Sequence, residues 1–103
     1  MSVAQKLVST LRKPVRVDEF KLREAARRGS AADELARNEA FSEAFDTVRG
    51  FYMDAWRNSD ALDVEVRERC HVAVCLLDDL KTQIISTVRD GAAARETLEK
   101  LQR

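Results

Sequence analysis

The residues best suited to metal chemistry are Cys70, His71 and Cys75, which fall within six consecutive positions. Thiolates and imidazoles are the usual ligands of zinc, and a structural zinc site needs four of them. The whole sequence has two cysteines and one histidine, and neighbouring ligands on a straight helix point in different directions. We therefore expect no metal and no other cofactor.

The two cysteines also bear on the compartment in which the protein works. On a helix, residues five positions apart point about 140° away from each other, so Cys70 and Cys75 cannot form a disulfide with each other. We interpret both as small buried hydrophobic residues in a reducing compartment.

Two pairs of carboxylates, Asp78 with Asp79 and Glu65 with Glu68, have the residue types for acid–base chemistry or Mg²⁺ binding. A catalytic site also needs a nucleophile, a base or a metal that converges on the same place. The sequence offers no such partner, and its three glycines lie too far apart to form a phosphate-binding loop. The pairs are typical of a solvated helix face, so we predict a non-enzymatic protein without catalytic residues.

Basic side chains in the first third of the chain offer a different chemistry, the binding of phosphates or of an acidic protein surface. Residues 1–37 carry nine basic and five acidic residues, whereas residues 38–103 carry nine basic and thirteen acidic ones. The net charge of zero therefore conceals a basic arm and an acidic remainder. Acidic residues interrupt the basic ones, which favours protein docking or plain solubility over nucleic-acid binding. The candidate contacts are Arg12, Lys13, Arg16, Arg23, Arg27 and Arg28.

The spacing of apolar residues predicts two long amphipathic helices. Over residues 39–58 and again over 62–90, apolar side chains recur at steps of three and four, which places them on one helix face. Asn38 is expected to cap the first helix. Gly91 is expected to end the second in the left-handed conformation, before a short helix over 92–102. The apolar seam that would form the core or an oligomer contact comprises Phe41, Phe45, Val48, Tyr52, Trp56, Val66, Cys70, Ala73, Leu77, Leu80 and Ile84.

Four aromatic residues of the first long helix allow two interpretations. They could form an exposed recognition stripe, because aromatic residues anchor many interfaces. At helical spacing they are more often part of a core, which is the interpretation we favour, with the last of them partly accessible near the following turn. They are Phe41, Phe45, Tyr52 and Trp56.

The segments before residue 38 predict shorter elements. Residues 18–28 fit a short helix closed by Gly29, and residues 30–36 fit one further helical turn. Residues 1–17 contain four bases and no acid, as a transit peptide does, but their apolar spacing also fits a short helix ended by Pro14. We favour the short helix, and no continuous apolar run supports a secretory signal.

Composition and helix length together define the expected fold. With 45% hydrophobic residues, zero net charge, three glycines and one proline, the chain is typical of neither disorder nor a β-sandwich. No apolar run approaches the roughly 20 residues that span a membrane. The two long helices would measure about 30 Å and 42 Å, so their unequal lengths leave apolar surface uncovered.

We therefore predict an all-α fold, an antiparallel helical hairpin with short flanking helices whose bundle is completed by self-association. A basic N-terminal arm with short helices would occupy residues 1–37. The hairpin and a short C-terminal helix would occupy residues 38–103.

The motifs NEAFSEAF, YMDAWRNS, DVEVRER and LLDDLKTQIISTVRDG follow one another from Asn38 to Gly91. Their Phe-x3-Phe, Ala-Trp and terminal Asp-Gly elements resemble those of small helical proteins encoded by tailed bacteriophages. The resemblance covers about half of the chain and leaves the basic arm outside. It implies a role in head assembly or DNA packaging, and it brings no catalytic residues with it.

These features predict a non-enzymatic interaction protein that acts in virion assembly or DNA packaging, through self-association and through phage or host protein partners. Two alternatives stay open. One is a DNA-binding packaging factor similar in role to a small terminase subunit. The other is an inhibitor of a host defence protein, in which the acidic residues after Arg37 would imitate nucleic acid. We expect the protein in the host cytoplasm or associated with the virion, neither secreted nor bound to a membrane.

Overall fold

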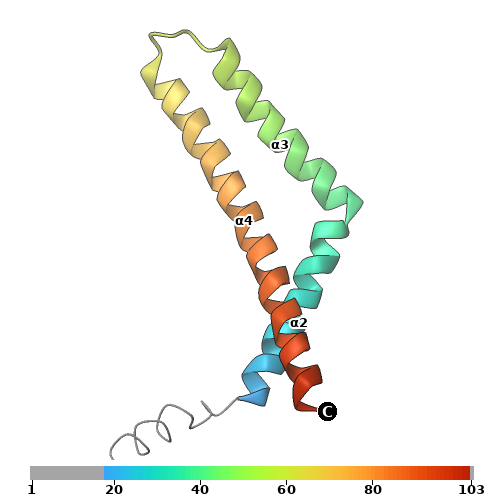
Figure 1. Ribbon diagram of the computed structural model, residues 1–103. Helices are drawn as coiled ribbons and strands as arrows, with labels where there is room; N and C mark the ends of the chain where they lie inside the picture. Colours follow the sequence, from blue (N-terminus) through green and yellow to red (C-terminus); the bar gives the residue numbers. More distant parts are fainter. Residues whose placement is uncertain (1–17, 103) are drawn as a thin grey trace, which may run out of the picture.

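The structure, a computed structural model, describes residues 18–102 and is built from helices (Figure 1). The helices are α2 (Glu19–Arg37), α3 (Glu39–Asn58) and α4 (Val64–Leu101). No strand occurs between residues 18 and 102, so the all-α prediction is confirmed. The segment before Pro14 and its predicted helix lie outside the described residues.

Each helix begins at a side chain that caps it. The carboxylate of Asp18 accepts a hydrogen bond from the backbone N–H of Lys21, and that of Asp63 accepts one from Val66. The side chain of Asn38 accepts one from Phe41 at 2.8 Å, as the sequence predicts. Caps of this kind satisfy backbone donors that a helix start leaves unpaired. Because Asn38 also ends α2 in an extended conformation, one residue separates α2 from α3 and makes the bend between them.

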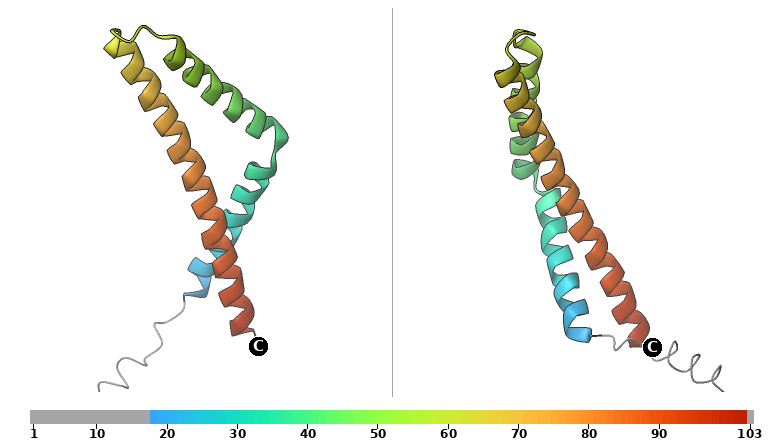
Figure 2. Two further views of the ribbon diagram at one scale, coloured as in Figure 1. Left: turned by 45° about the horizontal axis from the view of Figure 1, so that its top comes forward. Right: turned by 90° about the vertical axis from the view of Figure 1, so that its left-hand side faces the viewer.

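Helix α4 is the axis on which the other two helices are arranged (Figures 1 and 2). It has 38 residues and therefore a length of about 57 Å. Helix α3 lies along its N-terminal half, and α2 packs on its C-terminal half. Both run in the direction opposite to α4, and α3 draws away from α4 toward its junction with α2 (Figure 1).

The crossing of α2 and α4 depends on two glycines. A Cβ atom built on Gly29 would lie 2.5 Å from the Cα atom of Gly91, and the reverse distance is also 2.5 Å. It would further lie 3.1 Å from the carbonyl oxygen of Thr87, which belongs to the facing backbone. Only residues without a side chain permit backbones to approach this closely. Both glycines are buried, and the close packing of α2 against α4 follows from them.

The helix ends predicted at these two glycines are wrong. Neither glycine has a positive φ, and each lies within a continuous helix. The two short elements predicted over residues 18–36 are one helix, α2, and the short helix predicted over 92–102 is the last part of α4. A glycine costs a helix interior about 1 kcal/mol relative to alanine, and the close contact between the two backbones offsets this cost.

The described part of the chain is long and thin, with little interior. Its radius of gyration is 22.3 Å, against about 13 Å for a compact domain of 100 residues. Among apolar residues, only Cys70 and Ala94 are buried in the described chain. Two helices laid on one long helix form a single layer, and a layer encloses no core.

Helices α2, α3 and α4 contain no stretch that is both long enough and apolar enough to cross a membrane.

Substitution of the crossing glycines tests this packing. We expect Gly29→Ala and Gly91→Ala each to lower the free energy of unfolding by about 1–3 kcal/mol, because the added methyl group must push the helices apart. Gly50→Ala is the matched control, since a Cβ atom at that position of α3 meets nothing within 4 Å. The control should gain up to about 1 kcal/mol from helix propensity. Thermal unfolding followed by circular dichroism distinguishes the two results, and equal stabilisation by all three changes would contradict the glycine contact.

Candidate functional site

Three polar contacts fix the position of α3 along α4. Arg49 donates hydrogen bonds to both carboxylate oxygens of Asp78, from Nε at 2.8 Å and from Nη2 at 3.3 Å. Near the turn, the guanidinium of Arg67 lies over the Trp56 ring, 4.6 Å from its centroid. At the other end, Lys81 Nζ lies 5.7 Å from the centroid of the Phe45 ring. The three contacts agree on the level of α3 along α4 to within about four residues.

The Arg49–Asp78 pair is also the main electrostatic feature between these helices. The hydrogen bond from Arg49 holds the pKa of the Asp78 carboxyl below its ordinary value, and the positive charges of Arg49 and Lys81 act in the same direction. The same hydrogen bond raises the pKa of Arg49. Both groups are exposed to solvent, so the pair sets alignment more than it adds stability.

The predicted apolar seam is only partly covered in a single chain. Cys70 is 5% exposed. Phe41, Phe45, Tyr52, Ala73, Leu77 and Ile84 are half-buried between the helices. Four further seam residues are exposed: Val48, Trp56, Val66 and Leu80. The seam therefore faces the right way to join α3 to α4, and its flank remains open to solvent.

Sequence reasoning missed the most exposed member of this surface. Phe51, 66% exposed, stacks edge-on against Tyr52 with ring centroids 5.4 Å apart. On α4, Val72 and Leu76 are also exposed, the latter at 63%. Phe51 and Val72 fall outside the steps of three and four that define the seam, which is why the spacing did not select them. The same search for steps of three and four on the neighbouring face of each helix would have found both residues.

Two exposed apolar stripes follow from the steps on these neighbouring faces. On α3 the stripe consists of Ala44, Val48, Phe51 and Ala55, which recur at steps of four, three and four. On α4 it consists of Val72, Leu76 and Leu80, at steps of four. All are exposed except Ala55, which is half-buried. We call these the α3 stripe and the α4 stripe.

Both stripes lie on the same side of the α3–α4 layer. At about 100° per residue, the α3 stripe is rotated by about 100° from the direction in which Phe45 and Trp56 face α4. The α4 stripe is rotated in the same sense, by about 110°, from the direction in which Cys70 and Leu77 face α3. Because the helices run in opposite directions, rotations of the same sense end on the same side of the layer. The two stripes thus form one apolar face, which we call the stripe face.

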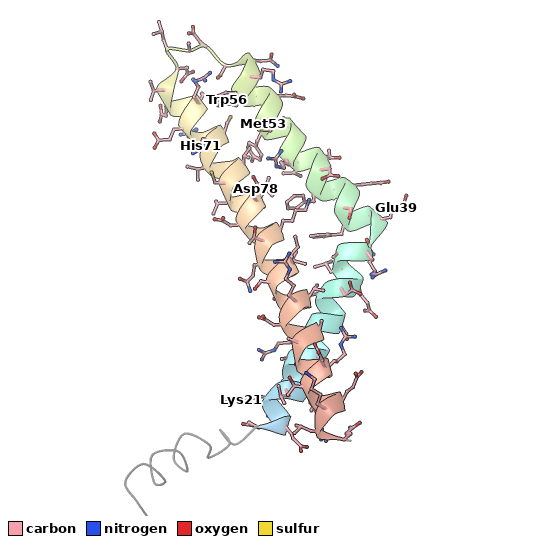
Figure 3. The ribbon with its side chains drawn as sticks, in the orientation of Figure 1. Lys21, Glu39, Met53, Trp56, His71 and Asp78 are labelled. Carbon is pink, nitrogen blue, oxygen red and sulfur yellow. The ribbon has the colours of Figure 1, made fainter. Side chains whose placement is uncertain are left out.

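The opposite side of the layer is more polar and carries a shallow pocket. Met53 and Trp56 extend from α3 toward α4, where Cys70, His71 and Val74 complete the lining (Figure 3). His71 Nε2 lies 3.7 Å from the Sγ atom of Cys75, one helical turn away. Both cysteines are free thiols, and Cys75 is exposed, so the prediction that both are buried is wrong for Cys75. No group of three or more potential metal ligands occurs among residues 18–102.

The structure places half of the basic candidates on α2. Arg23 pairs with Glu19 at 3.4 Å, and Arg27 pairs with Glu24 at 3.0 Å, each within the same helix. The hydrogen bond from Arg27 lowers the pKa of Glu24, which keeps this partner charged. Arg28 makes no ion pair with another described residue. The other three candidates, Arg12, Lys13 and Arg16, lie outside the described residues.

Comparison of the chain with protein-family models, with curated proteins and with solved structures found no match. The stripe face is therefore interpreted from its own geometry.

Removal of the Asp78 charge tests the contact that aligns α3 with α4. We expect Asp78→Asn to lower the melting temperature slightly at pH 7. The folded-state pKa of Asp78 is depressed, so its contribution is present above the unfolded value near 3.8 and disappears as the pH falls through the folded pKa. The difference from the unaltered protein should therefore be constant between pH 7 and about pH 5 and shrink below that.

Asp79→Asn is the matched control for this experiment. It removes the same charge from the neighbouring position, and Asp79 makes no ion pair within residues 18–102. An equal pH dependence in both variants would contradict a specific role of the Arg49–Asp78 pair.

Proposed function

We propose that the protein is a non-enzymatic α-helical interaction protein that works by burying its exposed apolar surface against protein partners, including further copies of itself. The hairpin of α3 and α4 would be one half of a bundle that association completes. The observation that carries this proposal is the amount of large apolar side chain left in solvent by a well-formed set of helices. Among residues 18–102, thirteen large apolar residues are exposed, including Phe51, Leu76 and Leu80.

Exposure on this scale favours a partner on energetic grounds. Monomeric proteins rarely expose a contiguous apolar patch larger than a few hundred Å², and larger patches mark interaction sites. Removal of apolar surface from water is worth about 25 cal/mol per Å². Full burial of a Val, Leu or Phe side chain is worth about 1.5–3 kcal/mol, so coverage of even a few of these residues would stabilise the protein considerably.

We further propose that this association serves virion assembly or DNA packaging. The support for this step is the resemblance of residues 38–91 to small helical proteins of tailed bacteriophages. The segment that carries the resemblance includes both stripes of the stripe face. The same proposal places the protein in the host cytoplasm or in the virion.

The DNA-binding alternative has weaker support from the described residues. Two of the three basic candidates on α2, Arg23 and Arg27, already have carboxylate partners on that helix. A phosphate would have to replace these partners, which reduces the gain from each contact. Fluorescence anisotropy with duplex DNA at two salt concentrations tests this alternative. Salt-sensitive binding would favour it, and no binding at low salt would remove it.

The mass of the protein in solution tests the proposed function. We expect light scattering to give a mass that exceeds 11.7 kDa and rises with concentration. Phe51→Ser should weaken association about ten-fold or more, because it removes a large apolar side chain from the interface. Phe20→Ser is the matched control, since Phe20 is 72% exposed on α2, away from the stripe face. A strict monomer that also purifies without any protein partner would contradict the proposal.

A further inference from the structure

We propose that the partner on the stripe face is a second copy of this chain, packed face to face and antiparallel about a two-fold axis that passes beside Leu76. This inference rests on the proposed function and specifies the partner and its orientation. The two α3 helices and the N-terminal halves of the two α4 helices would form a four-helix bundle. A two-fold contact requires a surface that complements itself, and the spacing of the exposed residues meets this requirement.

The α4 stripe is symmetric about Leu76. Together with the polar residues at its two ends, the stripe consists of Arg69, Val72, Leu76, Leu80 and Gln83, at steps of three, four, four and three. In an antiparallel pair centred on Leu76, this residue meets its own copy, and Val72 meets Leu80 of the second copy. Each apolar residue therefore faces an apolar residue along the full stripe.

The α3 stripe is also symmetric, and its centre lies at about the same level along the helices as Leu76. Its steps of four, three and four have their centre between Val48 and Phe51. The ion pair from Arg49 to Asp78 places Leu76 level with residue 51, and the contact of Lys81 with Phe45 places it level with residue 50. The contact of Arg67 with Trp56 places Leu76 level with residue 47. The mean of these three levels falls between Val48 and Phe51, and each level lies within about three residues, roughly 4 Å along the axis, of the centre of the α3 stripe. One two-fold axis therefore serves both stripes.

On α3, this axis sets Phe51 against Val48 of the second copy and Ala44 against Ala55. Two large residues thus lie at the centre of the α3 contact and two small ones at its ends. Such a pattern lets the helices approach evenly along their length.

The charges beside the α4 stripe are compatible with this arrangement. The two-fold axis brings Glu68 opposite Ile84 and Arg69 opposite Gln83 of the second copy. No charged residue of the α4 stripe region thus meets a like charge. Like charges held face to face would oppose association, so their absence favours this orientation.

The dimensions of the stripe face also suit a second copy. Helix α3 has 20 residues and is about 30 Å long. A layer of two helices, each about 10 Å wide, presents roughly 600 Å² of outline over this length. A standard stable interface buries about 800 Å² of accessible surface per partner, which is of the same order. C-terminal to the α4 stripe, α2 covers α4 around Gly91. The second copy therefore cannot slide along α4 toward its C-terminus.

Cysteine cross-linking tests the orientation. In a Cys75→Ser background, which leaves only the buried Cys70, we expect Leu76→Cys to form a disulfide-linked dimer under mild oxidation. Val72→Cys alone should not form one, whereas a mixture of Val72→Cys and Leu80→Cys proteins should. Thr82→Cys is the control, because it is exposed on α4 but points about 120° away from the α4 stripe.

A charge at the axis provides an independent measurement. Leu76→Lys should weaken dimerisation roughly 100-fold, because two ammonium groups would be buried against each other without partners. Thr82→Lys adds the same charge outside the stripe face and should leave the dimer unchanged. Both variants should keep their helical circular dichroism, since both side chains are exposed in the single chain.

The outcomes separate this inference from the proposed function. A dimeric mass without cross-linking of the Leu76→Cys variant would overturn the inference and leave the proposed function intact. Self-linking of Val72→Cys would do the same, because it indicates that the two α4 helices are parallel. A monomeric Leu76→Cys variant whose introduced thiol resists alkylation would show that another segment of the same chain covers the stripe, which also overturns the inference. A monomer whose introduced thiol reacts freely, and which has no protein partner, would contradict both.

Discussion

The contact between Gly29 and Gly91 is the constraint on which the arrangement of the helices depends. It allows the backbones of α2 and α4 to touch, with a hypothetical Cβ atom only 2.5 Å from the facing Cα atom. Because this crossing anchors α2 on the C-terminal half of α4, the bend at Asn38 directs α3 along the remaining half. The long helix thus carries two shorter helices in succession, and no second layer closes over them within residues 18–102.

The exposed apolar face is a direct consequence of this single-layer arrangement. In a bundle, each helix buries its apolar stripe against at least two neighbours. Here α3 contacts α4 and hardly touches α2, so each long helix has one flank without a neighbour among the described residues. Three contacts between α3 and α4, made by Arg49, Arg67 and Lys81, set the alignment of these two helices along each other. They give the two stripes a common centre, and a second copy would supply the missing neighbours of both helices.

Several elements could be predicted from the sequence because their causes are local. The apolar periodicity of residues 39–58 and the cap at Asn38 act within one or two turns, and α3 begins and ends where they indicate. The prediction that two glycines end helices was wrong because their role depends on a contact between distant parts of the chain. A glycine after a helical segment usually ends it, and nothing near Gly29 or Gly91 in the sequence shows that the two meet across 62 positions. Likewise, the spacing of Phe51 and Val72 is visible in the sequence, but only the arrangement of α3 and α4 places both on the same side of the layer.

The sequence by itself determined that this protein is all-helical, where its charges lie and which residues line the helix faces, because propensity, capping and periodicity are properties of short segments. Only the tertiary structure decided that α2 and α4 are uninterrupted, that Cys75 is exposed and that the described chain encloses almost no core. These features depend on which helix faces meet across long sequence separations. That choice is governed by the close approach of two glycine backbones, which no local pattern encodes.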